Sequence, residues 1–463
     1  MRKAWFIFLL IISINTLDSQ ERIGLTSDQS SGIYSIFLNP AMSARYTLDW
    51  HVNALSFHQF IETDYAFVTN SNLFSVLGSY NDIDIVGSRN QVSEGNSNRQ
   101  LIFDLNRGKK SFSINTSLLW PSAIWTRSKT EKVGIFIHSR GMASGFQLPE
   151  ELGYYELEGV RDSSVFVPGF NVAAASWTDL GVHYSRTLNK NDYGSEAIGV
   201  NARLVLPHES GKFTSENIVE YSRFQDTFSA EGLITDGGYN FFTSGSSGYS
   251  PRINGIGLAT DIGYHFTSPN YSYGISLLDL GFSYTSRNAD NYSIVSDTTV
   301  YVDGSLVDDP NDIIGIIEEV DRQLEDQVSR VVEEGGSFLL GMPTALSLQY
   351  ARPIHNHWMI STQLVQRIPL FSQGLRRPSS LSSVLHYRSG NFSIAVPLTL
   401  YEYRDLRAGF RLMYRYFYIG TDHISSLIGS QDFSGTDIYF GFQIYPFGKV
   451  AKQGGIQCFD FKE

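Results

Sequence analysis

The chain has 463 residues and a net charge of −12, and aromatic residues make up 14% of it. This acidic balance argues against nucleic-acid binding. The single cysteine, Cys458, excludes an internal disulfide, and its place near the C-terminus excludes a lipid anchor behind an N-terminal signal.

The N-terminal residues have the pattern of a secretory signal peptide. Arg2 and Lys3 precede an apolar run from Ala4 to Ile14, and polar or small residues follow it up to Ser19. The run is too short to span a bilayer as a helix, which takes about 20 residues. We therefore predict a signal peptide over residues 1–19. No other stretch is long and apolar enough to suggest a helical membrane protein.

Residues 20–45 are too irregular for a strand, yet they lie directly before the first strand pattern. They contain Ser31-Gly32 and the motif Asn39-Pro40-Ala41. We expect this segment to form an N-terminal plug inside a lumen, with Asn39, Pro40 and Ala41 as its motif.

From residue 46 onward, apolar residues alternate with small or polar ones. In residues 252–266, Ile256, Leu258 and Ile262 fall on one strand face, and Gly257 and Asp261 fall on the other. A second example places Leu278, Leu280, Phe282 and Tyr284 outward and Asp279, Gly281 and Ser283 inward. Strands of about 10 residues with one apolar and one polar face are typical of a barrel with lipid outside and water inside. The sequence predicts an all-β, transmembrane antiparallel β-barrel over residues 46–448.

Connection lengths orient this barrel and set its strand count. Long connections alternate with short turns, which outer-membrane barrels keep on the periplasmic side. Both ends of the barrel then lie on that side, as does a tail over residues 449–463. The pattern stays in register with about 14 strands, and about 16 is the second choice. Residues 46–57 and 65–69 cannot both be full strands unless another strand lies within residues 207–252.

The longest connection, residues 287–342, is predicted to be an extracellular loop insertion that contains a helix over residues 309–334. Asp309 and Pro310 suit the helix start, and Gly335-Gly336 suits its end. One face is apolar and the other strongly acidic. The helix either caps the barrel mouth or docks a partner.

Charged and polar residues recur at inward positions and form the candidate site. Asp261 and Asp279 should lie close together on adjacent strands. Arg407 and Arg411 lie four residues apart on one strand face. The inward charged and polar residues support two interpretations. They form either a charge-lined conduit that favours anionic solutes or opposed charges that pair across a filled lumen. The candidates are Asp179, His183, Arg203, Asp261, His265, Asp279, Arg407, Arg411 and Asp437.

The sequence gives little support for catalysis or metal binding. A hydrolase needs a nucleophile, a base and an orienting acid, but neither a Gly-x-Ser-x-Gly elbow nor a His-Glu-x-x-His motif occurs. His355 and His357 supply only two ligands in a short turn, so a solvated turn is the better interpretation. We predict no enzyme, no cofactor and no metal.

Several segments resemble known outer-membrane barrels. They are Ser31-Gly32 with Leu38-Asn39-Pro40-Ala41, Gly255 to Gly263, Leu278 to Phe282, Gly420-Thr421-Asp422 and Tyr439 to Phe442. The chain resembles FadL-type fatty-acid channels and the PorV barrel of the type IX secretion system. It is most similar to a group of Bacteroidota outer-membrane barrels classified as a domain of unknown function. The resemblance implies a FadL-like barrel in the outer membrane of a Gram-negative bacterium.

Two functions follow from these observations. The first is a scaffold or accessory subunit of an envelope complex for secretion, gliding or barrel assembly. The second is a passive channel or FadL-like transporter for small solutes. The expected partners are outer-membrane lipid and other envelope proteins.

Overall fold

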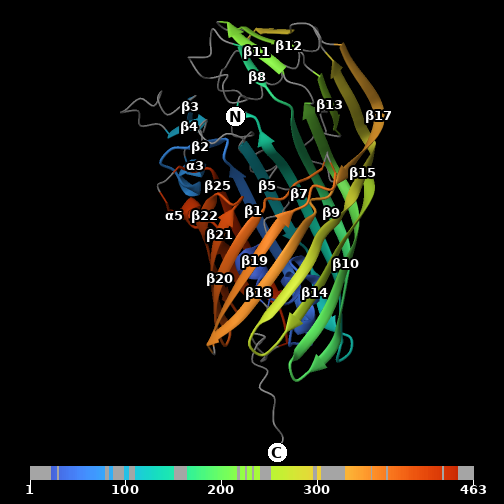
Figure 1. Ribbon diagram of the computed structural model, residues 1–463, viewed down its shortest axis with the longest axis vertical. Helices are drawn as coiled ribbons and strands as arrows, with labels where there is room; N and C mark the ends of the chain where they lie inside the picture. The colour runs from blue at the N-terminus through green and yellow to red at the C-terminus, as the bar shows by residue number, and fades with distance from the viewer. Residues whose placement is uncertain are drawn as a thin grey trace, which may run out of the picture.

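The barrel is the dominant feature of the computed structural model. The structure describes residues 22–28, 31–78, 83–86, 99–103, 110–150, 164–215, 219–224, 227–231, 234–239, 252–295, 300–303, 329–355, 357–371, 374–429 and 432–446. These residues form a closed antiparallel barrel of 14 strands (Figure 1). The predicted signal peptide and the tail over residues 449–463 lie outside the described residues.

The wall closes where β1 pairs with β25 on one side and with β5 on the other, in both cases antiparallel. Four wall positions are each shared by two consecutive segments. The wall strands in order are β1 (Trp50–Thr63), β5 (Lys110–Leu119) with β6 (Ser122–Thr126), β7 (Glu131–Leu148), β9 (Phe170–Asn191), β10 (Gly194–Ser215), β13 (Ile234–Tyr239) with β14 (Gly255–Thr267), β15 (Ser272–Val295), β17 (Ser329–Gly341) with β18 (Ala345–His355), β19 (Trp358–Arg367), β20 (Ser380–Ser389), β21 (Phe392–Tyr401), β22 (Asp405–Ala408) with β23 (Phe410–Tyr414), β24 (Phe417–Thr421) and β25 (Gly435–Ile444).

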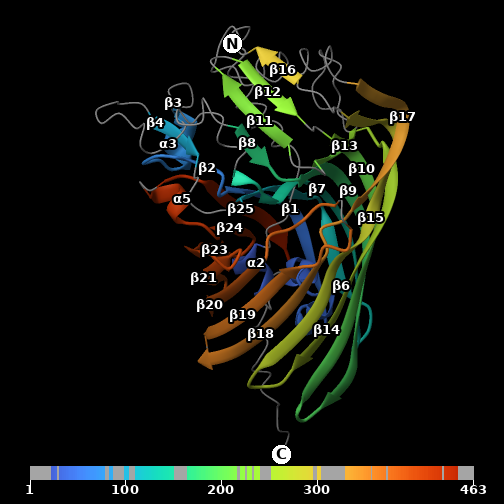
Figure 2. The ribbon, with the colours of Figure 1, turned by 45° about the horizontal axis from the view of Figure 1, so that its top comes forward.

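The predicted count of about 14 strands is confirmed, and the conflict near the N-terminus is resolved. Only β1 is a wall strand there, because β2 (Ala66–Val68) joins β3 (Ile83–Val86) and β4 (Arg99–Phe103) in a separate small sheet. A second small sheet contains β8 (Ser164–Val167), β11 (Val219–Phe224), β12 (Thr227–Glu231) and β16 (Val300–Asp303). Both small sheets lie at the end of the barrel opposite the short turns (Figure 2).

The predicted loop insertion over residues 287–342 needs correction. β15 continues to Val295 and β17 begins at Ser329, and the two strands pair with each other. Residues 329–334, predicted as the end of a helix, are therefore extended. Their β-branched residues suit a strand, and pairing with β15 continues the hairpin. Residues 304–328 of the insertion lie outside the described residues.

The alternation of side chains along the strands is confirmed, with one exception. Ile256 and Leu258 are exposed at 55% and 59%, whereas Asp261 is buried. Leu278 was expected to face outward, but it is only 1% exposed. The strand pairing shifts between Thr260 and Ile262, opposite Leu278 and Asp279, and Asp279 has a left-handed φ of 49°. This β-bulge places two consecutive residues of β15 inside the barrel.

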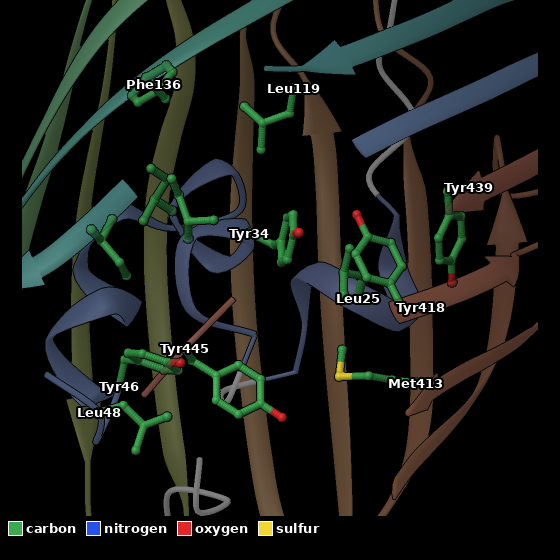
Figure 3. Packing of buried hydrophobic residues seen from close by; sticks show 13 residues of the cluster. Leu25, Tyr34, Tyr46, Leu48, Leu119, Phe136, Met413, Tyr418, Tyr439 and Tyr445 are labelled. Atoms are coloured by element: carbon green, nitrogen blue, oxygen red, sulfur yellow. The ribbon is translucent and has the colours of Figure 1, made fainter. Parts of the chain in front are cut away.

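The N-terminal segment from Arg22 to Asp49, called the plug below, lies within the barrel. It contains α2 (Ile23–Thr26), η2 (Gly32–Phe37) and η3 (Pro40–Arg45). Figure 3 shows Leu25 and Tyr34 of the plug beside the wall residues Tyr418 and Tyr439, and these side chains share one buried cluster. Among the described residues, no helix has the length and apolar character to cross a membrane. The helices α3 (Leu73–Gly78) and α5 (Ser425–Ile428) follow β2 and β24.

Candidate functional site

The Asn39-Pro40-Ala41 turn fastens the middle of the plug to the wall. Asn39 caps η3, since its Oδ1 accepts a hydrogen bond of 2.9 Å from the Ala41 amide, and Pro40 occupies the first helical position. The Asn39 Nδ2 donates to the Tyr264 carbonyl at 3.0 Å and to the Gln349 Oε1 at 2.9 Å. One side chain thus caps the plug helix and ties it to β14 and β18.

The wall beneath this turn is made of glycine. A Cβ at Gly199 would lie 2.3 Å from the Pro40 carbonyl carbon, and a Cβ at Gly263 would lie 2.0 Å from the Asn39 Oδ1. These distances are shorter than any normal carbon contact, so a side chain cannot fit without moving the turn. Gly199 of β10 and Gly263 of β14 therefore form a slot for the plug motif, and this close approach explains why these two positions are glycine.

A serine, a histidine and an asparagine meet where η3 contacts β9 and β10. The Ser43 Oγ lies 2.7 Å from the His183 Nε2, and the His183 Nδ1 lies 2.7 Å from the Asn201 Oδ1. This is the relative order of a nucleophile, a base and an orienting group. All three side chains are buried, and Asn201 also donates to the Ile36 carbonyl. Because the group is enclosed by plug and wall, it serves to attach the plug.

An ionic cluster crosses the lumen and is centred on the Asp279 carboxylate. Arg140 donates to both Asp279 oxygens, at 2.6 and 2.9 Å. Arg203 donates to the Asp279 Oδ1 at 2.6 Å, and Arg377 donates to the Oδ2. The Arg203 guanidinium also reaches the Asp261 Oδ1 at 2.7 Å and the Asp179 Oδ2 at 3.4 Å. The cluster joins β7, β9, β10, β14 and β15 to the segment before β20.

The β-bulge at Asp279 sets the geometry of this cluster. The Asp279 amide donates to the Asp261 Oδ1 at 2.7 Å, which confirms that the two aspartates lie close together. The Thr344 Oγ1 donates to the Asp279 carbonyl at 2.8 Å. With its backbone held on both sides, Asp279 directs its carboxylate toward the three arginines.

The cluster is balanced in charge and partly enclosed by apolar side chains. Three aspartates face three arginines, all buried. The Arg140 guanidinium lies 5.0 Å from the centre of the Trp177 ring. Trp177 belongs to a buried apolar group with Met142, Ala173, Val205, Ala259, Leu340, Met342 and Leu375. Such surroundings strengthen each ionic contact and make an unpaired charge costly.

The other end of the plug is held by carboxylates. The Asp28 Oδ2 accepts hydrogen bonds from Arg411 and Arg388 at 3.0 Å each. The Asp422 Oδ2 accepts one from the Ile23 amide at 2.6 Å. Burial, and then the neighbouring Asp437 carboxylate, raise the pKa of Asp422 to about 7. The start of the plug thus depends on the ion pairs of Asp28 and on a hydrogen bond to Asp422, whereas its middle depends on close packing and neutral hydrogen bonds.

The remaining predicted site residues do not join the ionic cluster. Asp437 pairs with His58 at 2.8 Å, and Arg407 pairs with Glu62 at 2.9 Å. His265 lies 3.5 Å from the Arg45 Nη1, and burial lowers the pKa of Arg45 to about 9. Arg407 and Arg411, expected on one face of one strand, are separated by the break at Gly409 between β22 and β23 and serve different partners.

Sequence reasoning placed Asp179, Arg203, Asp261 and Asp279 on the inner wall and expected Asp261 and Asp279 to lie close together, but it missed Arg377. Arg377 comes from the segment between β19 and β20, which folds inward and carries no strand periodicity. It also missed Asp28, which lies in the irregular plug and accepts hydrogen bonds from Arg411 and Arg388. No repeat pattern marks Arg377 or Asp28, so only the fold reveals them. No group of three or more His, Cys, Asp or Glu in the described part of the chain could hold a metal ion.

Comparison with known families identifies the chain by sequence. A family profile described as a family of unknown function (DUF5723) matches residues 28–422. The chain belongs to this family. The match begins in the plug at Asp28 and ends at Asp422, so it includes both carboxylates that hold the start of the plug. No curated protein matches the sequence.

Several solved barrels are similar in fold to this member of the DUF5723 family. The toluene transporter TbuX of Ralstonia pickettii is 8% identical, with a TM-score of 0.38, over 90% of this chain and 94% of the transporter. A mutant of the monoaromatic hydrocarbon channel TodX is 9% identical, with a TM-score of 0.44, over 94% of this chain and 98% of the channel. A FadL homologue of Pseudomonas aeruginosa is 11% identical, with a TM-score of 0.28, over 89% of this chain and 92% of the homologue.

Proposed function

We propose that this protein is an outer-membrane barrel that conducts small hydrophilic solutes when its plug is displaced. The outer wall supports a lipid environment, since aliphatic side chains project from it strand after strand. Exposed examples are Ile135, Val182, Ile198, Ile256, Leu258, Ile262, Leu348, Leu385 and Leu398. A soluble protein would bury such a belt.

Aromatic residues near the short turns support the same membrane placement. Tyr271 and Tyr273 stack at the start of the β14–β15 hairpin, with ring centres 6.4 Å apart, and Phe266 stacks on Tyr273 at 5.1 Å. Trp358 packs against Tyr387 at 4.8 Å beside another short turn. Aromatic side chains gather at both lipid–water interfaces of membrane barrels. The aromatic residues at the short turns then mark the periplasmic interface of the membrane.

The observation that carries the channel proposal is a plug held inside a polar wall by contacts of two kinds. The glycine slot keeps the Asn39 turn in place. The α2 end is held through Asp28, which pairs with two arginines, and through the hydrogen bond from the Ile23 amide to Asp422, and these contacts can be exchanged for contacts with solvent. Displacing the α2 end would open the lumen on the side of β20–β25 while the rest of the plug stays seated. The polar lining favours hydrophilic solutes over apolar ones.

The experiment is single-channel recording of the full chain in planar bilayers. The Asp28→Asn variant weakens two arginine contacts without changing side-chain size, and Asp192→Asn at an exposed turn is the matched control. We expect brief openings in the wild type, more frequent openings in Asp28→Asn and wild-type behaviour in Asp192→Asn. Folded barrels that are silent in all three proteins would refute the channel.

The pairing of the lumen charges favours a second candidate. Asp179, Asp261 and Asp279 all have arginine partners, as expected for a filled lumen. A closed barrel of this kind suits an accessory subunit of an envelope complex, as the PorV-like resemblance also implies. Silent barrels that crosslink in cells to one defined envelope protein would support this candidate over the channel.

A further inference from the structure

One side of the plug meets a row of polar side chains on β18 to β21. Gln349 is the cross-strand neighbour of Gln363, Gln363 of Ser382, and Ser382 of Thr399. All but Gln349 are at most 2% exposed. Because each pair faces the same way on adjacent strands, the four side chains form one continuous polar row on the inner wall.

Three members of this row have unused hydrogen-bonding groups. The Gln363 Nε2 and Oε1, the Ser382 Oγ and the Thr399 Oγ1 are all buried and find no hydrogen-bond partner among the described residues. Buried polar groups are almost always satisfied by protein or by ordered water. Several unsatisfied groups side by side on three adjacent strands therefore point to a polar occupant with both donors and acceptors.

The row meets a small cavity between plug and wall. The cavity has a volume of about 10 Å³, and Leu38, Met42 and Ser27 of the plug line it together with Gln349, Gln363 and Ser361. It also reaches Ser272, the first residue of β15 after a short turn. The volume corresponds to the centre of about one water molecule. An occupant of this size is water.

The row leads from this cavity toward the other end of the barrel. Thr399 pairs with Arg407, and Tyr401 pairs with Asp405 beside the turn over residues 402–404. Because the strands are tilted, cross-strand neighbours climb along the wall as well as around it. The polar row thus runs from the cavity, beside the plug, toward the rim formed by the turn over residues 402–404.

The plug is fitted differently on its other side. Against β10 and β14, the plug motif is packed onto Gly199 and Gly263 with no space for even one extra carbon atom. Against β18, Gln349 is fully engaged with Asn39, Ser276 and Ser347. The cavity lies beside Gln349, and the unused hydrogen-bonding groups begin one strand further, at Gln363. Plug and wall are thus closely packed on one side. On the other side they are separated by a polar seam, which consists of the cavity beside Gln349 and the side chains of Gln363, Ser382 and Thr399.

We propose that this seam holds a file of ordered water molecules and lets water cross the barrel while the plug remains in place. The cavity is lined by polar and apolar side chains with no aspartate, glutamate, lysine or arginine, and its volume takes about one water molecule, so a hydrated ion does not fit. Water permeation needs no displacement of the plug, and it therefore stands apart from the solute channel proposed above.

The test is the osmotic water permeability of vesicles that contain the full chain, measured by stopped-flow light scattering. The triple variant Gln363→Met, Ser382→Ala and Thr399→Val keeps the shape of the seam but removes its polar groups. Ser283→Ala is the matched control, because the Ser283 Oγ is also buried without a partner among the described residues but lies on β15, away from the seam. We expect water permeability to fall severalfold in the triple variant and to stay at the wild-type value in the control.

Ion conductance of the same vesicles separates this proposal from the solute channel. Water flow that persists without ion conductance, and that the triple variant lowers, supports the seam even if the channel proposal fails. Unchanged water flow in the folded triple variant overturns it. Because a variant can fail to fold, a high-resolution structure of the wild type provides an independent check. Ordered water density at Gln363, Ser382 and Thr399 is expected, and side chains that turn to protein partners instead would overturn the seam.

Discussion

The Asp279 carboxylate and the Arg140 guanidinium meet across the lumen in a two-point contact, with distances of 2.6 and 2.9 Å. Asp279 reaches this position from a left-handed β-bulge and Arg140 from the middle of β7. The contact links β7 to β15, which are separated along the wall by β9, β10 and β14. It also makes Asp279 the residue on which three buried arginines depend.

Replacing Asp279 with Asn should destabilise the barrel strongly. Asn tolerates the left-handed backbone, so the change removes the charge and leaves the bulge intact. Removing one partner from a buried ionic group typically costs about 3–5 kcal/mol. Urea unfolding in lipid vesicles measures the loss, with the exposed Asp192→Asn as the control. A loss no larger than that of the control would show that the cluster adds nothing to stability.

Replacing the outward Leu258 with Arg should impair insertion into lipid. Leu258 is 59% exposed on the outer wall. An arginine facing lipid near the bilayer midplane costs roughly 2–4 kcal/mol. Leu258→Phe, which keeps an apolar side chain, should behave like the wild type. Both variants can be compared by the folded fraction recovered in vesicles, and equal recovery would place Leu258 away from lipid.

Placing a methyl group at Gly199 should displace the plug without unfolding the wall. The added Cβ would lie 2.3 Å from the Pro40 carbonyl carbon and 2.4 Å from the Ala41 nitrogen. These are backbone atoms, so no side-chain rotation relieves the contact. We expect Gly199→Ala to increase protease cleavage within residues 22–49 while the barrel stays folded. Gly78→Ala is the control, because a Cβ there meets nothing within 4 Å. Identical cleavage of the two variants would contradict the slot.

Replacing Asp422 with Asn should change how stability depends on pH. The pKa of Asp422 is raised to about 7, whereas the pKa of an aspartate in an unfolded chain is about 3.9. Between these values the unfolded chain has lost a proton that the folded chain keeps, so this residue's contribution to stability falls as pH rises. Asn has no such proton. The stability of Asp422→Asn relative to the wild type should therefore increase from about pH 4 to about pH 7.

Urea unfolding of both proteins across this pH range gives the difference directly. Taking the difference cancels the contributions of titrating groups that do not interact with Asp422. Asp437, His58 and Tyr439 do interact with it, so the difference reports Asp422 together with its coupling to them. The same series for Asp192→Asn should give a difference that does not change with pH. A flat difference for Asp422→Asn as well would mean that Asp422 is not held protonated in the folded protein.

The sequence predicted the barrel well because its signal is repeated. Inward and outward residues alternate in almost every strand, so an error in one strand is outweighed by the others. Leu278 shows where this logic stops, because one bulge reverses the order of faces and no residue type announces it. Residues 329–334 show a second limit. Their apolar spacing fits a helix or a strand, and pairing with β15 decides between them.

The contacts of the site residues could be predicted only where both residues lie on regular strands. Asp261 and Asp279 could be paired because neighbouring strands carry them. Arg377 could not, because its segment folds into the lumen without any periodic pattern. Asp28 could not be matched to Arg411, because the two residues are 383 positions apart and Asp28 lies in a segment without a strand pattern.

The glycine slot has a consequence for the order of events during assembly. The plug comes before β1 in the chain, and the wall is completed only when β1 meets β25. The slot that holds the plug motif is built by β10 and β14, in the middle of the sequence. A plug that must reach a slot with no spare room cannot be threaded into a finished cylinder. We therefore expect the sheet to curl around a segment that is already seated, with the plug as an internal template for the wall.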